Sequence, residues 1–238
     1  MPRCYSGVRC LATLAGMCGA LVTARANAAI VTLVTPVGSV TGGQPVSAKA
    51  TFSTSAGHVH VVLENLFPNP KSVTQCLTGL EFHIDTGESS GSLASSLGTE
   101  RSIESNDNPF VEGGGISTGW ALATASADLK LKLLGTKTAP THTIIGPPDG
   151  SGLYSAANPS ITGGSHLPFL GVMATFEIDV PGVTAASGIS SAVFQFNTSA
   201  GFTVTGQQLV PEPATLWLLG IAALARRRRR RLVRITGA

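Results

Sequence analysis

The alternation of apolar and polar residues through the middle of the chain limits its fold more than any other feature. From position 46 onward, apolar residues alternate with polar ones as far as Phe52. A period of two places the apolar side chains on one face of a strand, which is the pattern of a half-buried β-strand. Runs with the same apolar patterning follow at residues 59–63, 80–84, 129–133, 172–180 and 194–196.

Clusters of turn-forming residues separate these runs. They lie at residues 41–43, 68–70, 113–115, 147–150 and 162–164. No long stretch has the 3.6-residue period of a helix, and only 12% of the residues are charged, which excludes a coiled coil or helical bundle. We predict an all-β fold, an antiparallel β-sandwich of about seven to nine strands spanning residues 29–209 as one domain. Residues 87–115 form either a long ordered excursion or a mobile loop.

The charge of the chain is unevenly distributed. Residues 29–210 contain six basic and twelve acidic side chains, although the whole chain has a net charge of +3. A nucleic-acid-binding face needs its positive charge on the folded surface. The composition therefore argues against a nucleic-acid partner.

The first 28 residues have the organisation of a secretory signal peptide. Arg3 and Arg9 precede an apolar stretch at residues 11–22, and Ala26 and Ala28 provide the small residues that signal peptidase accepts. The apolar stretch is shorter than the roughly 20 residues of a membrane anchor. We predict export, with cleavage by signal peptidase after Ala28.

Cysteine usage follows from this prediction. A lipoprotein signal needs a small residue before its cysteine, and the bulky Met17 precedes Cys18. Removal of the signal peptide leaves Cys76 as the single cysteine, so no intrachain disulfide can form. Cys76 is either a buried small apolar residue or an exposed thiol.

Residues 210–238 contain three elements in order. Pro211, Glu212 and Pro213 form a stiff segment that cannot join a helix interior, and the apolar run 214–225 follows it. The run ends at six consecutive arginines, Arg226, Arg227, Arg228, Arg229, Arg230 and Arg231. Cationic residues collect on the cytoplasmic side of a membrane segment, so we predict a transmembrane helix in the inner membrane with the preceding domain outside the cytoplasm.

This arrangement resembles the PEP-CTERM sorting signal of exported proteins in Gram-negative bacteria that make extracellular polysaccharide. The resemblance implies that the protein is the substrate of an exosortase, a membrane-embedded cysteine protease that cuts near the Pro-Glu-Pro motif and passes the ectodomain to the cell surface or matrix. The central region of the ectodomain, including residues 166–170 (His-Leu-Pro-Phe-Leu), is also loosely similar to other ectodomains that carry this tail, and this second resemblance implies no activity.

The apolar run departs from an ordinary membrane span in its length. Twelve residues extend about 18 Å as a helix, against a hydrocarbon core of about 30 Å. Snorkelling arginines and the apolar residues Leu232, Val233 and Ile235 can lengthen it. A basic tail for nucleic acid or acidic lipid is the alternative, but it does not account for the Pro-Glu-Pro motif and the apolar run.

Two G-x-S-x-G patterns raise the alternative of an extracellular hydrolase. They span residues 87–91 and 115–119, and Asp128 or Asp149 with His142 or His166 would complete a triad in the chain order of an α/β-hydrolase. That motif works on a strand-to-helix turn, and the alternating helices are absent from the pattern. We therefore assign no catalytic residue and expect the protein not to be an enzyme.

A metal site is the second alternative, with His58, His60 and His83 as its candidate ligands. His58 and His60 share one face of a strand, and Glu81, His83 and Asp85 share one face of another. If these two strands pair, their side chains could converge on zinc or copper. Otherwise they are the solvated faces of two amphipathic strands, and we assign no metal or cofactor.

Other polar motifs have structural explanations. The Asn106–Asn108 and Asp149–Gly150 segments are typical of turns rather than of calcium loops. The sequon at Asn197 is interpreted as a strand end, and Trp120 and Tyr154 as core or edge residues. Together these patterns predict an exported surface or extracellular-matrix protein with a structural or adhesive role in exopolysaccharide or biofilm. A carbohydrate-binding module remains a further alternative.

Overall fold

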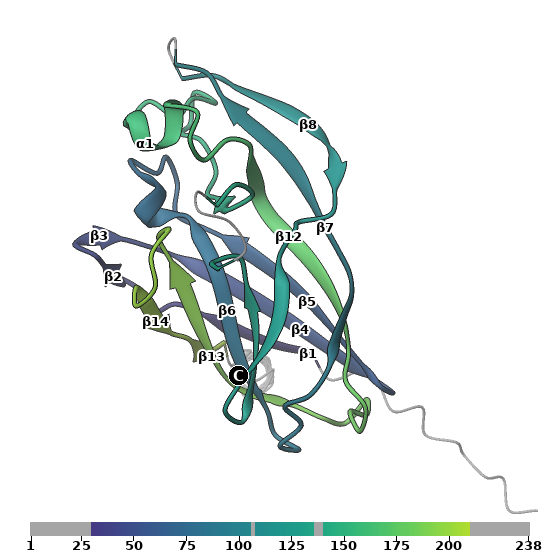
Figure 1. Cartoon of the computed structure of the whole chain (residues 1–238). Coiled ribbons are helices and arrows are strands. Elements are labelled where there is room, and N and C mark those ends of the chain that lie inside the picture. Colours follow the sequence, from purple (N-terminus) through teal and green to yellow (C-terminus); the bar gives the residue numbers. More distant parts are fainter. Residues whose placement is uncertain (1–29, 106–107, 136–139, 210–238) are drawn as a thin grey trace, which may run out of the picture.

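The computed structural model describes residues 30–105, 108–135 and 140–209, and nearly all of its regular structure is β-sheet (Figure 1). The predicted signal peptide and the sorting tail lie outside these residues. The all-β prediction is confirmed.

Within the described residues, thirteen strands belong to a single hydrogen-bonded sheet that folds on itself into two layers. The long layer has the strand order β8-β7-β12-β5-β4-β1-β15. Its strands are β8 (Phe110–Ile116), β7 (Ser92–Ile103), β12 (Phe169–Asp179), β5 (His58–Asn65), β4 (Ala48–Ser55), β1 (Ile30–Val34) and β15 (Gln207–Gln208).

The short layer has the order β14-β13-β6-β10-β9. Its strands are β14 (Thr203–Thr205), β13 (Ile189–Phe196), β6 (Leu77–Ile84), β10 (Asp128–Lys132) and β9 (Ala121–Ala125). The small hairpin of β2 (Val40–Thr41) and β3 (Gln44–Pro45) forms a separate sheet.

The two-residue strand β11 (Ile144–Ile145) joins the layers. It pairs antiparallel with β6 and parallel with β12. The prediction of an antiparallel sandwich of about seven to nine strands is therefore corrected in three respects: the described sheet has thirteen strands, its two layers are continuous, and one of its strand pairs is parallel. On the other side, the loop between β8 and β9 is bound to β7, because Ser96 Oγ accepts hydrogen bonds from the Thr118 amide (3.2 Å) and hydroxyl (2.8 Å).

The main core fills the space between the layers. It contains the inward-facing residues of β1, β4, β5 and β12 from one side and of β6, β10 and β13 from the other. Phe52 of β4 meets Phe82 of β6 with ring centroids 5.1 Å apart, and Trp120 meets Phe176 at 5.3 Å. Each of the six predicted apolar runs contributes to this core, because its alternate residues point between the layers.

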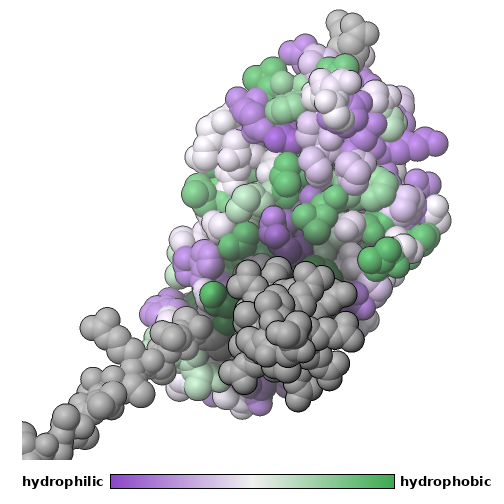
Figure 2. Space-filling model, turned by 180° about the vertical axis from the view of Figure 1, so that it is seen from behind, coloured by the Kyte–Doolittle hydropathy of each residue, from purple (hydrophilic) through white to green (hydrophobic). Residues whose placement is uncertain are grey.

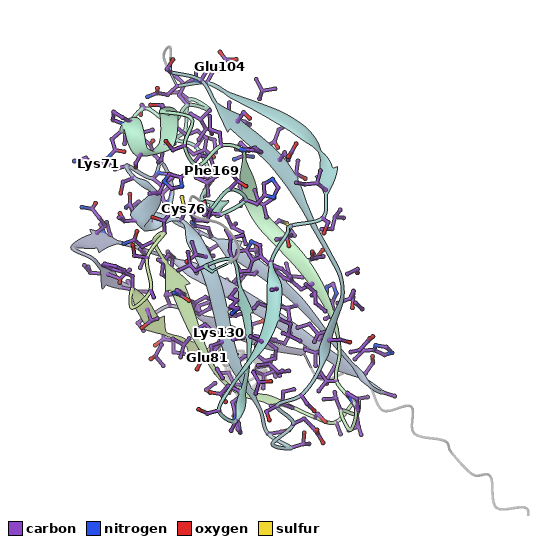
Figure 3. All side chains as sticks on the ribbon, viewed as in Figure 1. Lys71, Cys76, Glu81, Glu104, Lys130 and Phe169 are labelled. Atoms are coloured by element: carbon purple, nitrogen blue, oxygen red, sulfur yellow. The ribbon has the colours of Figure 1, made fainter. Side chains whose placement is uncertain are left out.

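A second apolar cluster lies beyond the N-terminal end of β6, under loops and two short helices. It contains Val73, Cys76, Ile103, Ile145, Tyr154, Ile161 and Phe169. The helices are η1 (Val73–Gln75) and α1 (Pro159–Thr162). Figure 3 shows Cys76 and Phe169 close to one another in this upper part of the molecule.

Residues 87–115, predicted as an excursion or a loop, contain most of a long hairpin. Strand β7 pairs with β12 along nearly its whole length, and among the strands that the structure describes β8 pairs with β7 alone. Figure 1 shows the β7–β8 hairpin projecting beside β12. Five of the seven residues of β8 are exposed and three of these are glycines, so a periodic apolar face does not mark this strand in the sequence.

Candidate functional site

His58 and His60 lie on the outer face of the long layer. They alternate with the buried Val59 and Val61 along β5, which leaves both imidazoles on the side away from the core. Each meets a carboxylate on the neighbouring strand β12: His58 Nδ1 lies 2.8 Å from Asp179 Oδ1, and His60 Nδ1 lies 2.5 Å from Glu177 Oε1.

His83 lies on the outer face of the short layer instead. Its Nδ1 is 2.7 Å from Asp128 Oδ1 on β10, and the neighbouring Lys130 donates to Glu81 across the same two strands at 3.1 Å (Figure 3). Asp85, the third polar residue of this face, accepts a hydrogen bond from the Gly188 amide at 2.8 Å.

The structure does not bring these two histidine groups together. Strands β5 and β6 are separated in the sheet by β12 and β11, so the pairing on which a metal site depended is not formed. Their polar faces point away from the core on opposite layers. In the described residues, no group of three or more His, Cys, Asp or Glu side chains is arranged to hold a metal ion.

The two G-x-S-x-G segments lie in connections of the sheet. The first lies in the turn between β6 and β7, and the second begins at the end of β8 and continues into the loop before β9. Each leads to a strand, so neither forms the strand-to-helix turn on which the nucleophile of an α/β-hydrolase sits.

The predicted triad partners are engaged elsewhere. Asp128 contacts His83, and Asp149 accepts hydrogen bonds from its own turn, chiefly from Ser155, which lowers the pKa of its carboxyl. His142 Nδ1 lies 3.1 Å from the Thr118 carbonyl, and His166 Nδ1 lies 3.2 Å from the Pro140 carbonyl.

Cys76 is fully buried in the second apolar cluster. Burial raises the pKa of its thiol to about 12, and the adjacent Thr143 hydroxyl opposes this shift. Because the thiolate is the reactive form, this cysteine is an inert core residue in the folded chain. Of the two alternatives for Cys76, the structure selects the buried one.

Several other predicted roles are settled by position. Trp120 and Tyr154 are 5% and 0% exposed, so both are core residues and neither offers a surface for stacking on a sugar. Asn197 directly follows β13 and has a positive φ of 69°, as expected for a strand end.

A buried cation was not predicted from the sequence. Arg101 of β7 is 7% exposed and donates to the Glu112 carboxylate of β8 and, at 2.6 Å, to the Tyr154 hydroxyl. Its guanidinium lies 4.2 Å from the centroid of the Phe110 ring. The Tyr154 hydroxyl donates in turn to the Gly146 carbonyl at 2.8 Å, and burial raises the pKa of this phenol to about 12.

The contacts of Arg101 with Glu112 and Tyr154 attach the β7–β8 hairpin to the second apolar cluster. Arg101 and Glu112 face each other across the hairpin. The sequence contained a signal for this pair only if the hairpin itself was recognised, because eleven positions separate the two residues.

The predicted sorting residues 211–213 and 226–231 lie outside the described part of the chain. The described part ends at Leu209, whose amide donates to the Thr32 carbonyl at 2.9 Å, immediately after β15. In residues 30–105, 108–135 and 140–209, no helix has both the length and the apolar character needed to cross a membrane.

Comparison with known proteins identifies one segment of the chain. The family described as the PEP-CTERM protein-sorting motif matches residues 209–231, which contain the Pro-Glu-Pro motif, the apolar run and the arginines. No curated protein and no solved structure matches the chain. The chain therefore carries a PEP-CTERM sorting motif, the mark of an exported protein that is held in the membrane until an exosortase processes it.

Proposed function

We propose that this protein is a non-catalytic structural or adhesive component of the cell surface or extracellular matrix, associated with exopolysaccharide or biofilm. The observation that carries the proposal is the sorting motif at residues 209–231, attached directly to a folded β-domain. In this proposal signal peptidase cuts after Ala28, the run 214–225 spans the inner membrane, and the arginines set its orientation.

The outer face of the long layer supports an adhesive role. Along β4, β5 and β12 it carries the ion pair between Lys49 and Glu64 and the His58 and His60 pairs with their carboxylates. Such side chains both donate and accept hydrogen bonds, which suits contact with the hydroxyl groups of a polysaccharide.

The charge of the domain limits which class of polysaccharide it can bind. Residues 29–210 contain twice as many acidic as basic side chains, so long-range repulsion disfavours a strongly acidic polymer. A neutral polysaccharide is the partner that this surface favours.

In the view from behind, hydrophobic residues lie dispersed among hydrophilic ones over the part that the described residues form (Figure 2).

The sorting step is tested on the protein recovered from the surface and medium of its own host. The expected intact mass is that of a chain that begins at Ala29 and ends near residues 211–213. Deletion of the exosortase gene and the substitution Glu212→Ala should both leave the tail in place. The matched control is Glu104→Ala, which removes an exposed carboxylate of the ectodomain and should leave processing unchanged. Surface protein that keeps residues 226–238 would contradict the proposal.

The matrix role is tested separately. A strain that lacks the gene should lose biofilm mass or retain less polysaccharide at the surface, and the wild-type gene should restore both. A truncated protein that ends after Leu209 should be secreted into the medium, and its gene should fail to restore the biofilm mass and the retained polysaccharide. Normal biofilm in the strain that lacks the gene would contradict a structural role.

A further inference from the structure

The two-residue strand β15 connects the folded domain to the sorting motif. It pairs with the edge of β1, with Leu33 opposite Gln208 and Val34 opposite Gln207. The pairing continues to the first residue of the matched motif, because the Leu209 amide donates to the Thr32 carbonyl at 2.9 Å.

This pairing leaves almost no free chain before the motif. Pro211 is two residues beyond Leu209, so its Cα lies at most about 7 Å from the last hydrogen-bonded residue. The domain itself has a radius of gyration of about 16 Å for its length. A membrane-embedded protease that binds the chain on both sides of a cut near the Pro-Glu-Pro motif would therefore contact the folded domain.

Little holds β15 in place. Gln207 and Gln208 are exposed, and Leu209 is 49% exposed, so backbone hydrogen bonds rather than buried apolar area retain the strand. Because hydrogen-bonded pairs alternate along an antiparallel ladder, Val34 and Gln207 form the next bonded pair after Thr32 and Leu209.

The chain is firmly anchored one residue earlier. The Gly206 amide donates to the Ala192 carbonyl at 2.8 Å, and a Cβ at Gly206 would come within 2.9 Å of the Phe194 ring. Val204, two residues before, packs against the main core. Opening of β15 therefore stops at Gly206 and lengthens the free chain before Pro211 from about 7 Å to about 17 Å.

We propose that β15 is a retaining strand that must separate from β1 before the exosortase cuts, so that residues 207–209 belong to the processing segment although the matched motif begins at 209. The proposal rests on the exosortase processing described above. The step itself is non-covalent: the hydrogen bonds between β15 and β1 are exchanged for bonds to water or to the enzyme.

The first test weakens the pairing of β15 with β1. It compares two substitutions at Gln207, which lies outside the sorting motif of residues 209–231. Gln207→Pro removes the amide donor to β1, whereas Gln207→Ala removes only an exposed side chain and keeps that donor. In a pulse-chase measurement in the host, Gln207→Pro should be processed about fivefold faster than wild type, the change in opening equilibrium expected from one lost backbone hydrogen bond. Gln207→Ala should be processed like wild type.

The locking test uses the double variant Val34→Cys with Gln207→Cys, whose residues lie directly opposite each other. Cys76 is buried and does not compete for the new disulfide. The fraction of chains that form this disulfide should be processed at least about tenfold more slowly than either single variant. Thermal unfolding of the recovered ectodomains checks that every variant is folded.

The outcomes separate the two proposals. If wild-type protein is cut only when the exosortase is present, and both Gln207→Pro and the cross-linked variant are cut at the wild-type rate, the retaining role of β15 is overturned alone. If wild-type protein is not cut even with the exosortase present, the proposed function is overturned together with this inference.

Discussion

Cys76 and Tyr154 show how burial converts two ordinary side chains into pH-sensitive contributors to stability. Burial raises the pKa of the thiol from 9.0 to about 12 and that of the phenol from 10.0 to about 12. The folded chain therefore holds protons that the unfolded chain releases above pH 9. Their contribution is complete below about pH 9 and is lost as the pH rises toward 12.

We expect the free energy of unfolding to be level near neutral pH and to fall above about pH 9, by at most about 1.4 kcal/mol per pH unit for each group. In Cys76→Ala the decline should begin nearer pH 10, where Tyr154 alone contributes. Urea unfolding of the processed protein at a series of pH values measures this. A decline with the same onset in both proteins would show that the thiol does not contribute.

Arg101 is the residue whose removal should cost most among the charged side chains described. Arg101→Ala removes hydrogen bonds from Glu112 and Tyr154 and the stacking on Phe110. We expect a loss of about 2–3 kcal/mol in the free energy of unfolding, as for other buried hydrogen-bonded charges. Lys71→Ala, which removes an exposed cation, is the control and should change stability by less than about 0.5 kcal/mol. A loss of that small size for Arg101→Ala would mean that the hairpin is held by its backbone alone.

At the scale of elements, β11 joins the layers, and a glycine follows it for a specific reason. A Cβ at Gly146 would lie 1.9 Å from the Phe67 carbonyl oxygen, whereas a Cβ at Gly150 would meet nothing within 4 Å. The close approach is to backbone, so it cannot be relieved by turning a side chain.

Gly146→Ala should therefore destabilise the protein by about 3 kcal/mol, because the connection after β11 must move away from residue 67. Gly150→Ala makes the same chemical change in open space and should be neutral or slightly stabilising. Thermal or urea unfolding compares the two. Equal stabilities would contradict the tight crossing after β11.

Strands β7 and β8 illustrate where prediction from periodicity stops. The runs around Val59, Phe82 and Phe176 have an apolar period of two in the sequence because their alternate residues are buried between the layers. Strand β7 is formed instead by backbone pairing with β12, and its side chains are mostly exposed or half-buried. Backbone hydrogen bonds are the same for every non-proline residue, so a strand that relies on them leaves no apolar period in the sequence.

At the scale of the molecule, the two apolar clusters share strands. Strand β12 contributes Phe169 to the second cluster and Phe176 to the main core, and Cys76 of the second cluster directly precedes β6. Loss of one cluster should therefore disrupt the other, and the domain should unfold in a single cooperative transition.

Two probes already present in the chain measure this. Trp120 reports on the main core, and the reaction of the Cys76 thiol with a disulfide reagent reports on the second cluster. In protein processed near residue 213, which lacks Trp217, tryptophan fluorescence comes from Trp120 alone. The two urea transitions should coincide. Thiol exposure at clearly lower urea would show that the second cluster opens independently.

The sequence alone determined the sorting motif and the strand periodicity, because both are local patterns: three ordered elements within 29 residues in one case, and a two-residue repeat in the other. Only the tertiary structure decided which strands are neighbours, and with them the separation of His83 from His58 and His60, the burial of Arg101 and the attachment of β15 to β1. The physical reason is that strand pairing joins residues far apart in the chain through backbone groups that carry no residue identity. A single sequence therefore predicts the strands that bury one face in the core, and the packing of the whole core selects their order.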